Sequence, residues 1–351
     1  MLLFIGLSKS YANDTLNYQL KLHGFLDIYY GYDFNKPKNT QRLPFLYNHN
    51  RHNQFALNLG TIGVEFTSGN LSSKLTFQTG SYVEDNYSTE PGLTKLIHEA
   101  SVKYRFKKNG RFSSEIGILP SHLGLESAPS FDNPTLTRSL VAENSPYYMA
   151  GLRNNFHASD SLTISVLILN GWQRIAKQEG NSLPAFGTQF NWQASKNFMV
   201  NWSTFVGSVY PDSLRRMRYY NNIFGIWKWC KKSNVFFGFD LGIEQRNKQS
   251  KRYDFWYSPF LIMDYSFNNN FKIAARGELF NDTKGIQIKP QGFNGANIWG
   301  TSLNLDYTCN EYLKFRIEGK LYFSELDIFT QSNETPASSN AFICAGLSWE
   351  L

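Results

Sequence analysis

The sequence lacks any long hydrophobic run. No stretch approaches the about 18 consecutive apolar residues that a membrane-spanning helix needs, and the mean hydropathy is -0.39. A bundle of membrane helices is therefore excluded. Cysteine is also scarce, since Cys230, Cys309 and Cys344 are odd in number and far apart. This spacing argues against a small exported domain that is held together by disulfides.

Long basic runs are absent as well. No run of Lys or Arg exceeds two residues, although the formal net charge is +7 at pH 7. Nucleic acid is therefore not an expected partner, and a basic channel lining or an anionic lipid surface fits the charge better. Aromatic residues, in contrast, are abundant: 29 Phe, 20 Tyr and 8 Trp accompany 26 Gly and 12 Pro. This composition indicates an all-β chain.

The N-terminus differs from the rest of the chain. Met1 to Leu7 is a short apolar run, and Ser10-Tyr11-Ala12 follows it as a small-x-small cleavage pattern. Residues 1–12 are therefore expected to be a signal peptide, although the usual basic start is missing. A hydrophobic tail is the alternative. Residues 13–351 then form a single β-barrel domain.

Polar and apolar residues alternate in segment after segment. From Tyr18 to Asp33, one face is aliphatic with tyrosines at both ends, while the other face carries Lys21, His23 and Asp27. Aromatic residues that bracket an aliphatic band are typical of a strand whose outer face contacts lipid. Similar alternation recurs along the chain, and Gly60 is expected to mark a bulge in the second strand.

The connections between these segments alternate in length. Seven are short and rich in Asn, Asp, Gly and Ser, as tight turns require. The longer ones span residues 34–51, 85–96, 120–146, 173–184, 209–218, 247–252, 281–296 and 325–339. Short turns alternating with long loops predict a transmembrane antiparallel up-and-down β-barrel of sixteen strands, or fourteen if one weak hairpin is lost. Both termini are expected on the periplasmic, short-turn side.

A barrel of about sixteen strands leaves an aqueous lumen. The polar faces carry charges that a dry interior does not tolerate. The residues expected to line the lumen are Lys21, Asp27, Glu99, Lys103, Arg105, Arg153, Asp240, Arg276, Glu278, Lys314 and Glu318.

The connection at 120–146 is the expected constriction of this lumen. It is the longest, and it mixes apolar residues with the charges of Glu126, Asp132, Arg138 and Glu143. We expect it to fold inward, and the alternative is an external cap in which Arg138 pairs with a neighbouring carboxylate. Arg42 and Arg51, in the first long connection, are further candidates for facing anions. His49 and His52 lie nearby without Cys or carboxylate neighbours, so no metal site is predicted.

Several of these segments resemble one known family. The early run Gly24 to Tyr30, Pro44 to Asn53 (PFLYNHNRHN), Glu126 to Tyr148 (ESAPSFDNPTLTRSLVAENSPYY) and Leu169 to Ile175 (LNGWQRI) are similar to the OmpL-like β-barrel porins of Bacteroidota. The resemblance implies a pore in the outer membrane of a Gram-negative bacterium. It implies no substrate and no role for any single residue.

Two functions from different classes remain open at this point. The first is a porin for small hydrophilic solutes or ions, and the alternative is a non-conducting scaffold barrel that binds a partner. An enzyme is not expected, because the six histidines show no catalytic motif, and no cofactor is predicted. Membrane lipid and lipopolysaccharide are expected partners, whereas a homotrimer and an accessory lipoprotein stay open.

Overall fold

A computed structural model describes residues 18–108, 110–332 and 334–351. The expected signal peptide at 1–12 lies outside these described residues. Within them, no helix is long and apolar enough to cross a membrane.

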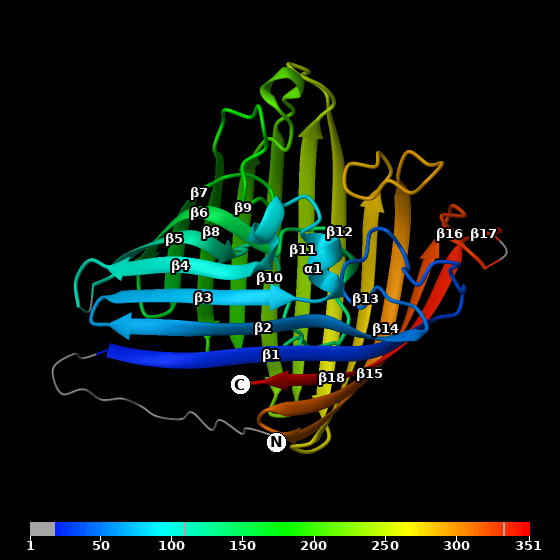
Figure 1. Ribbon diagram of the computed structural model, residues 1–351, viewed down its shortest axis with the longest axis horizontal. Helices are drawn as coiled ribbons and strands as arrows, with labels where there is room; N and C mark the ends of the chain where they lie inside the picture. Colours follow the sequence, from blue (N-terminus) through cyan, green and yellow to red (C-terminus); the bar gives the residue numbers. More distant parts are fainter. Residues whose placement is uncertain (1–17, 109, 333) are drawn as a thin grey trace.

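Sixteen antiparallel strands close into one barrel, in which each strand pairs with its neighbours in sequence (Figure 1). They are β1 (Tyr18–Asp33), β2 (Gln54–Ser68), β3 (Leu71–Thr79), β4 (Ile97–Arg105), β5 (Phe112–Pro120), β6 (Tyr148–His157), β7 (Leu162–Leu169), β8 (Ala185–Ser195), β9 (Phe198–Gly207), β10 (Arg218–Cys230), β11 (Ser233–Gln245), β12 (Tyr253–Ser266), β13 (Phe271–Asp282), β14 (Ala296–Asn310), β15 (Leu313–Ser324) and β18 (Ser339–Glu350). The predicted up-and-down barrel of sixteen strands is confirmed, and the count of fourteen is not.

The last strand closes the barrel against the first. β18 pairs with β1 from Phe25 opposite Glu350 to Asp33 opposite Phe342, and with β15 on its other edge. Among the sixteen described barrel strands, closure leaves no edge strand, and an open sheet edge is not tolerated in a bilayer. In Figure 1 the strands β1 to β4 run across the strands of the opposite wall, as the tilt of barrel strands requires.

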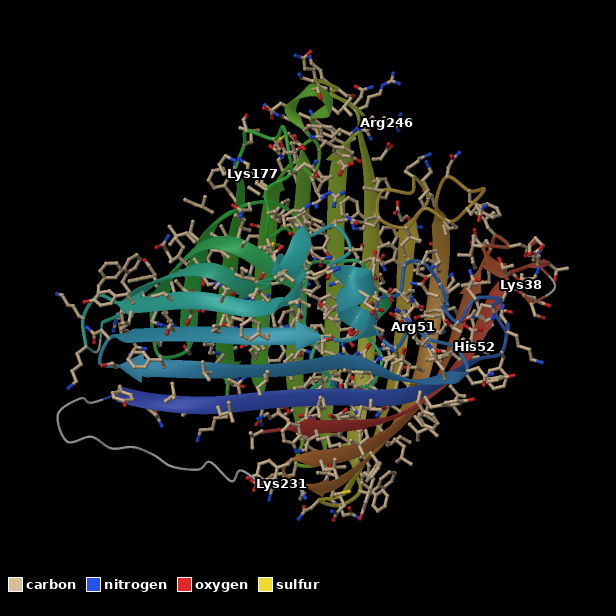
Figure 2. All side chains as sticks on the ribbon, viewed as in Figure 1. Lys38, Arg51, His52, Lys177, Lys231 and Arg246 are labelled. Atoms are coloured by element: carbon tan, nitrogen blue, oxygen red, sulfur yellow. The ribbon has the colours of Figure 1, made fainter. Side chains whose placement is uncertain are left out.

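Eight long connections, L1 to L8, emerge at one end of the barrel. They span residues 34–53, 80–96, 121–147, 170–184, 208–217, 246–252, 283–295 and 325–338. L2 contains the helix α1 (Ser81–Asn86) and the turn η1 (Gly92–Leu96), L3 contains α2 (Leu140–Glu143), L5 contains η2 (Asp212–Leu214), and L8 contains the hairpin β16 (Phe329–Thr330) and β17 (Pro336–Ala337). Figure 2 shows Lys177 and Arg246 at this end and Lys231, in a short turn, at the other.

The two faces of each strand differ as their alternation predicts. In β1, Leu26 and Ile28 are exposed on the outer face, whereas Asp27 and Tyr29 are buried toward the interior. The bulge in β2 lies at Asn58 and not at Gly60, because Asp27 pairs with Leu59 and Ile28 pairs with Leu57. The extra residue turns the Asn58 amide inward, where it accepts from the His49 backbone N–H at 2.8 Å.

Candidate functional site

L3 lies against the polar inner faces of β14 and β15. The Leu136 backbone N–H donates to Asn304 Oδ1 at 3.1 Å, and the Thr137 N–H donates to Glu318 Oε2 at 2.6 Å. Lys320 Nζ donates to the Arg138 carbonyl at 2.6 Å. A loop folded into a barrel must satisfy its backbone groups there, and charged side chains of the wall supply these partners.

A second set of contacts holds the preceding part of L3. Arg316 donates to the carbonyls of Ser130 at 2.7 Å and Asn133 at 3.0 Å. Lys314 Nζ donates to the Phe131 carbonyl at 2.6 Å and lies 3.9 Å from the centre of the Phe131 ring. L3 therefore follows β15 over several residues, and the basic side chains of Lys314 and Arg316 bind its backbone oxygens.

One arginine joins L3 to three wall or loop carboxylates. Arg276 lies 2.9 Å from Glu318, 3.4 Å from Glu126 and 3.5 Å from Glu278, and Lys320 lies 3.1 Å from Glu278. All five side chains are almost completely buried. Because an uncompensated buried charge is costly, removal of one member of such a network typically destabilises a protein by ~3–5 kcal/mol.

The four charged L3 residues expected at the constriction lie in different surroundings. Glu126 is buried and accepts from the Ser139 N–H at 3.0 Å. Arg138 is 1% exposed and donates to carbonyls of L3 itself, including Ser127 at 2.7 Å. Glu143 is buried against L1, and Asp132 is the member of the set that is exposed.

Glu143 connects L3 to L1. Its carboxylate accepts from the Tyr47 backbone N–H at 2.8 Å and from the Asn48 backbone N–H at 3.2 Å. Burial raises the pKa of Glu143 to about 7, and the two N–H donors offset only part of this effect. The contact between the two loops therefore includes a carboxyl group that titrates near neutral pH.

The two arginines predicted in L1 are both paired. Arg42 Nε lies 2.9 Å from Asp33, and its guanidinium stacks 3.4 Å from the centre of the Phe342 ring. Arg51 Nη1 lies 2.6 Å from Asp85 in L2. These pairs fix L1 to the end of the wall and to α1.

All eleven residues expected to line the lumen lie on inner strand faces. Eight are buried or hold a close partner there: Asp27, Glu99, Arg153, Asp240, Arg276, Glu278, Lys314 and Glu318. Asp27, for instance, lies 3.1 Å from His49 Nε2. The other three are on β1 and β4: Lys21, Lys103 and Arg105.

The interior is open beside β1 to β4. A cavity of about 670 Å³ is lined there by Lys21, His23, Glu65, Lys74, His98 and Glu99, together with Pro129 of L3. A second cavity of about 300 Å³ lies along L3 and shares His98 and Pro129 with the first. At the long-loop end, Asp33, Arg42 and Asn340 line a space of about 160 Å³.

The opposite wall carries inward aromatic residues that the predicted site did not include. Trp172 of L4 packs edge-on to Phe205 and Tyr220, with ring centres 5.0 and 4.9 Å apart, and Tyr220 stacks on Trp256. Together with Leu140 of L3 they belong to one large apolar cluster. On β12, Trp256 shares the inner face with the polar residues Asp254, Ser258 and Asp264, so the alternation of this strand does indicate which face points inward.

Asp306, Arg316 and Lys320 lie outside the predicted lumen set, although Arg316 and Lys320 bind L3 directly. Arg316 and Lys320 continue the alternation that identified Lys314 and Glu318 on β15. Asp306 lies 2.7 Å from Arg316, its partner across the strand pair. The period-two pattern was therefore a sufficient signal for all three.

The fold is similar to that of solved porins. The anion-selective porin from Comamonas acidovorans is 9% identical, with a TM-score of 0.64 over 95% of this chain and 100% of that one. The channel DcaP of Acinetobacter baumannii is 11% identical, with a TM-score of 0.60 over 95% and 97%. OmpT of Vibrio cholerae, in its trimer form, is 8% identical, with a TM-score of 0.61 over 95% and 99%.

No curated protein matches the sequence. The family described as "Putative beta-barrel porin-2, OmpL-like" matches residues 19–348, nearly the whole chain. Its match and the closed sixteen-strand barrel point to a channel in the outer membrane. The chain belongs to this OmpL-like family of β-barrel porins.

Proposed function

We propose that this porin allows passive diffusion of small hydrophilic solutes past L3, which narrows the interior. The observation that supports this most directly is the row of hydrogen bonds from the inner faces of β14 and β15 to L3, including those of Asn304 and Glu318. The solute path runs beside β1 to β4, where the cavities of about 670 and 300 Å³ adjoin at Pro129. The short-turn end faces the periplasm.

Asp132 is the L3 charge that meets the solute, because it is exposed while the others are buried. The test is chemical modification in a planar bilayer. In a background with Cys230 and Cys309 replaced by Ser, Asp132→Cys is treated with a cationic methanethiosulfonate. The conductance of single channels then falls, because the added group is bulky and lies in the path.

Glu325→Cys is the matched control, since this residue is exposed in L8. Its modification leaves the conductance unchanged. Equal effects at the two positions contradict a constriction at L3. Folded protein without any resolvable conductance steps favours the alternative, a non-conducting scaffold barrel.

We also propose a homotrimer, as in the trimer form of OmpT from Vibrio cholerae. A groove of about 500 Å³ on the outer face is lined by Ala275, Gly319, Ala341 and larger apolar neighbours. Apart from the two chain neighbours, no heavy atom lies within 4 Å of a Cβ added at Gly319. A second copy fills this groove, so Gly319→Trp shifts the mass seen by native mass spectrometry from trimer to monomer. An unchanged mass contradicts the proposed contact face.

A further inference from the structure

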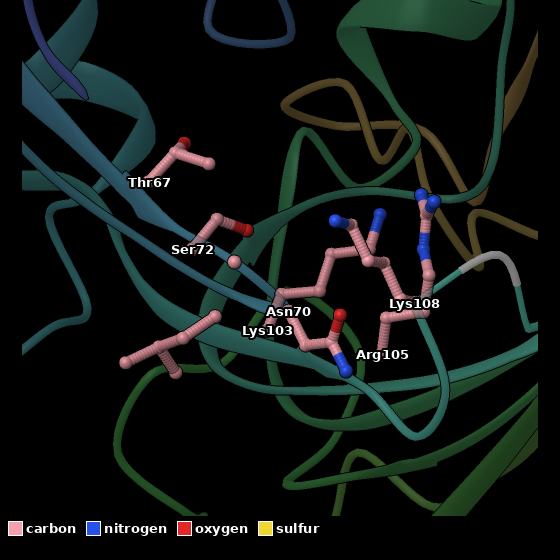
Figure 3. Close-up of a pocket in the computed structure, with 8 residues that line it drawn as sticks. Thr67, Asn70, Ser72, Lys103, Arg105 and Lys108 are labelled. Carbon is pink, nitrogen blue, oxygen red and sulfur yellow. The ribbon is translucent and has the colours of Figure 1, made fainter. Parts of the chain in front are cut away.

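Three cationic side chains gather at the short-turn end of the barrel, beside β2 and β3. Lys103 and Arg105 extend from the inner face of β4, and Lys108 extends from the turn that follows (Figure 3). They line a cavity of about 370 Å³ with Thr67, Asn70 and Ser72. This volume lies within the range of small-ligand sites.

The local structure brings the two sides of this cavity together. Ser72 pairs with Lys103 in the register of β3 and β4, and the Arg105 backbone N–H donates to the Asn70 carbonyl at 2.9 Å. Gly69, whose φ is 56°, lies in the tight turn between β2 and β3 on the other side of the cavity. Hydroxyl and amide groups therefore line the same cavity as the cations.

The cavity holds positive charge that the protein itself does not neutralise. None of its lining residues is Asp or Glu, and within the described ranges no ion pair or side-chain hydrogen bond involves Lys103, Arg105 or Lys108. Glu115 lies opposite Lys103 in the β4–β5 register, but its ion-pair contact is with Arg153 at 4.0 Å. Glu99 likewise lies 4.0 Å from Lys74.

We propose that this cavity is a binding site for a soluble anion that carries a phosphate, sulfate or carboxylate group. Arg105 offers a planar pair of donors, and the two ammonium groups add charge-assisted hydrogen bonds. Thr67, Asn70 and Ser72 supply neutral donors on the other side. The inference does not depend on conduction, since binding at this end requires no passage through L3.

A lipid headgroup has the same anionic chemistry, but the orientation of β4 argues against it. Val102 and Tyr104, which alternate with Lys103 and Arg105, are exposed on the outer face. The side chains of Lys103 and Arg105 consequently point to the interior, where soluble anions have access and acyl chains do not.

The test is calorimetric titration of the full chain, in nanodiscs of zwitterionic lipid, with inorganic phosphate and separately with inorganic sulfate. The variant K103Q/R105Q/K108Q removes the cluster. Its affinity for phosphate is expected to fall at least about tenfold, equivalent to ~1.4 kcal/mol. Wild-type affinity also falls as sodium chloride is raised, because the charges are solvent-accessible.

The matched control is K228Q/K231Q/K232Q, which removes the same charge from the end of β10 and its short turn. Circular dichroism and heat-modifiable migration establish that both variants fold. The control binds phosphate as the wild type does. Equal losses in both variants indicate general attraction and overturn the proposal, as does an unchanged affinity in K103Q/R105Q/K108Q.

A third arm separates the two sources of anion. Nanodiscs that contain phosphatidylglycerol are compared with zwitterionic ones. The proposed site binds phosphate equally in both. If phosphate does not bind in either and the cluster instead determines retention of phosphatidylglycerol, the site recognises a headgroup and the proposal of a soluble ligand is wrong.

Discussion

Glu143 gives the porin a pH-dependent contact between L1 and L3. Burial raises its pKa from 4.5 to about 7. A carboxyl group whose pKa is higher in the folded state binds its proton more tightly there, so its stabilising contribution is complete below about pH 4.5. This contribution declines as the pH rises toward 7 and is lost above it.

The size of the effect follows from the shift in pKa. Each tenfold change in proton affinity corresponds to about 1.4 kcal/mol, so a pKa raised from 4.5 to about 7 corresponds to roughly 3 kcal/mol between pH 4 and pH 8. Glu143→Gln removes the titration and keeps an oxygen that accepts from Tyr47 and Asn48. The variant is therefore more stable than the wild type at pH 8, and the two proteins are similar at pH 4.

The assay is the free energy of unfolding in denaturant, measured for wild type and Glu143→Gln at several pH values. The difference between the two proteins cancels the titration of every other group. Glu325→Gln, an exposed substitution in L8, is the control and shows no such trend. A difference for Glu143→Gln that stays constant with pH to within about 0.5 kcal/mol, the usual effect of surface substitutions, refutes the reasoning.

Three further predictions concern charge and packing. Arg276→Met leaves buried carboxylates without a partner and lowers the free energy of unfolding by ~3–5 kcal/mol, whereas Arg246→Met, at a partly exposed ion pair, changes it by less than ~1 kcal/mol. Gly242→Ala places a methyl group 2.0 Å from the Trp256 ring and lowers the free energy of unfolding by ~1–3 kcal/mol. Gly319→Ala is the control, since the added methyl group meets no atom within 4 Å beyond its chain neighbours. Equal shifts of the melting temperature in the two variants contradict this prediction. Reversal potentials under a salt gradient are expected to give modest anion selectivity that weakens as salt rises, and clear cation preference is the contrary result.

The barrel was largely predictable from the sequence because alternation and turn length are local properties. The first strand, Tyr18–Asp33, has the bounds that its alternation indicates, and the loop predicted at 120–146 spans 121–147. The bulge was misplaced because glycine marks freedom of the backbone and not the need for an inward amide. The contacts of Asn58 with His49, Asn48 and Asp27 hold that position.

The details of L3 were not predictable in the same way. Nothing periodic in the loop distinguishes Arg138, which binds carbonyls of its own loop, from Asp132, which is exposed. These differences depend on how the loop meets residues more than a hundred positions later, such as Glu278 and Glu318. The charged residues of L3 could therefore be identified from the sequence, but the groups that surround them could not.

The contacts of L3 separate the wall charges into two groups, those that bind L3 and those that do not. Backbone groups of a loop inside a barrel need partners, and the charges of β13 to β15 provide them. Arg276, Glu278 and Glu318 are thus neutralised against L3 and against one another and have little charge left for a solute. The charges of β1 to β4, including Lys21 and Lys103, lie beside open space. Selectivity should consequently respond to substitutions on β1 to β4, whereas substitutions on β13 to β15 should first change stability.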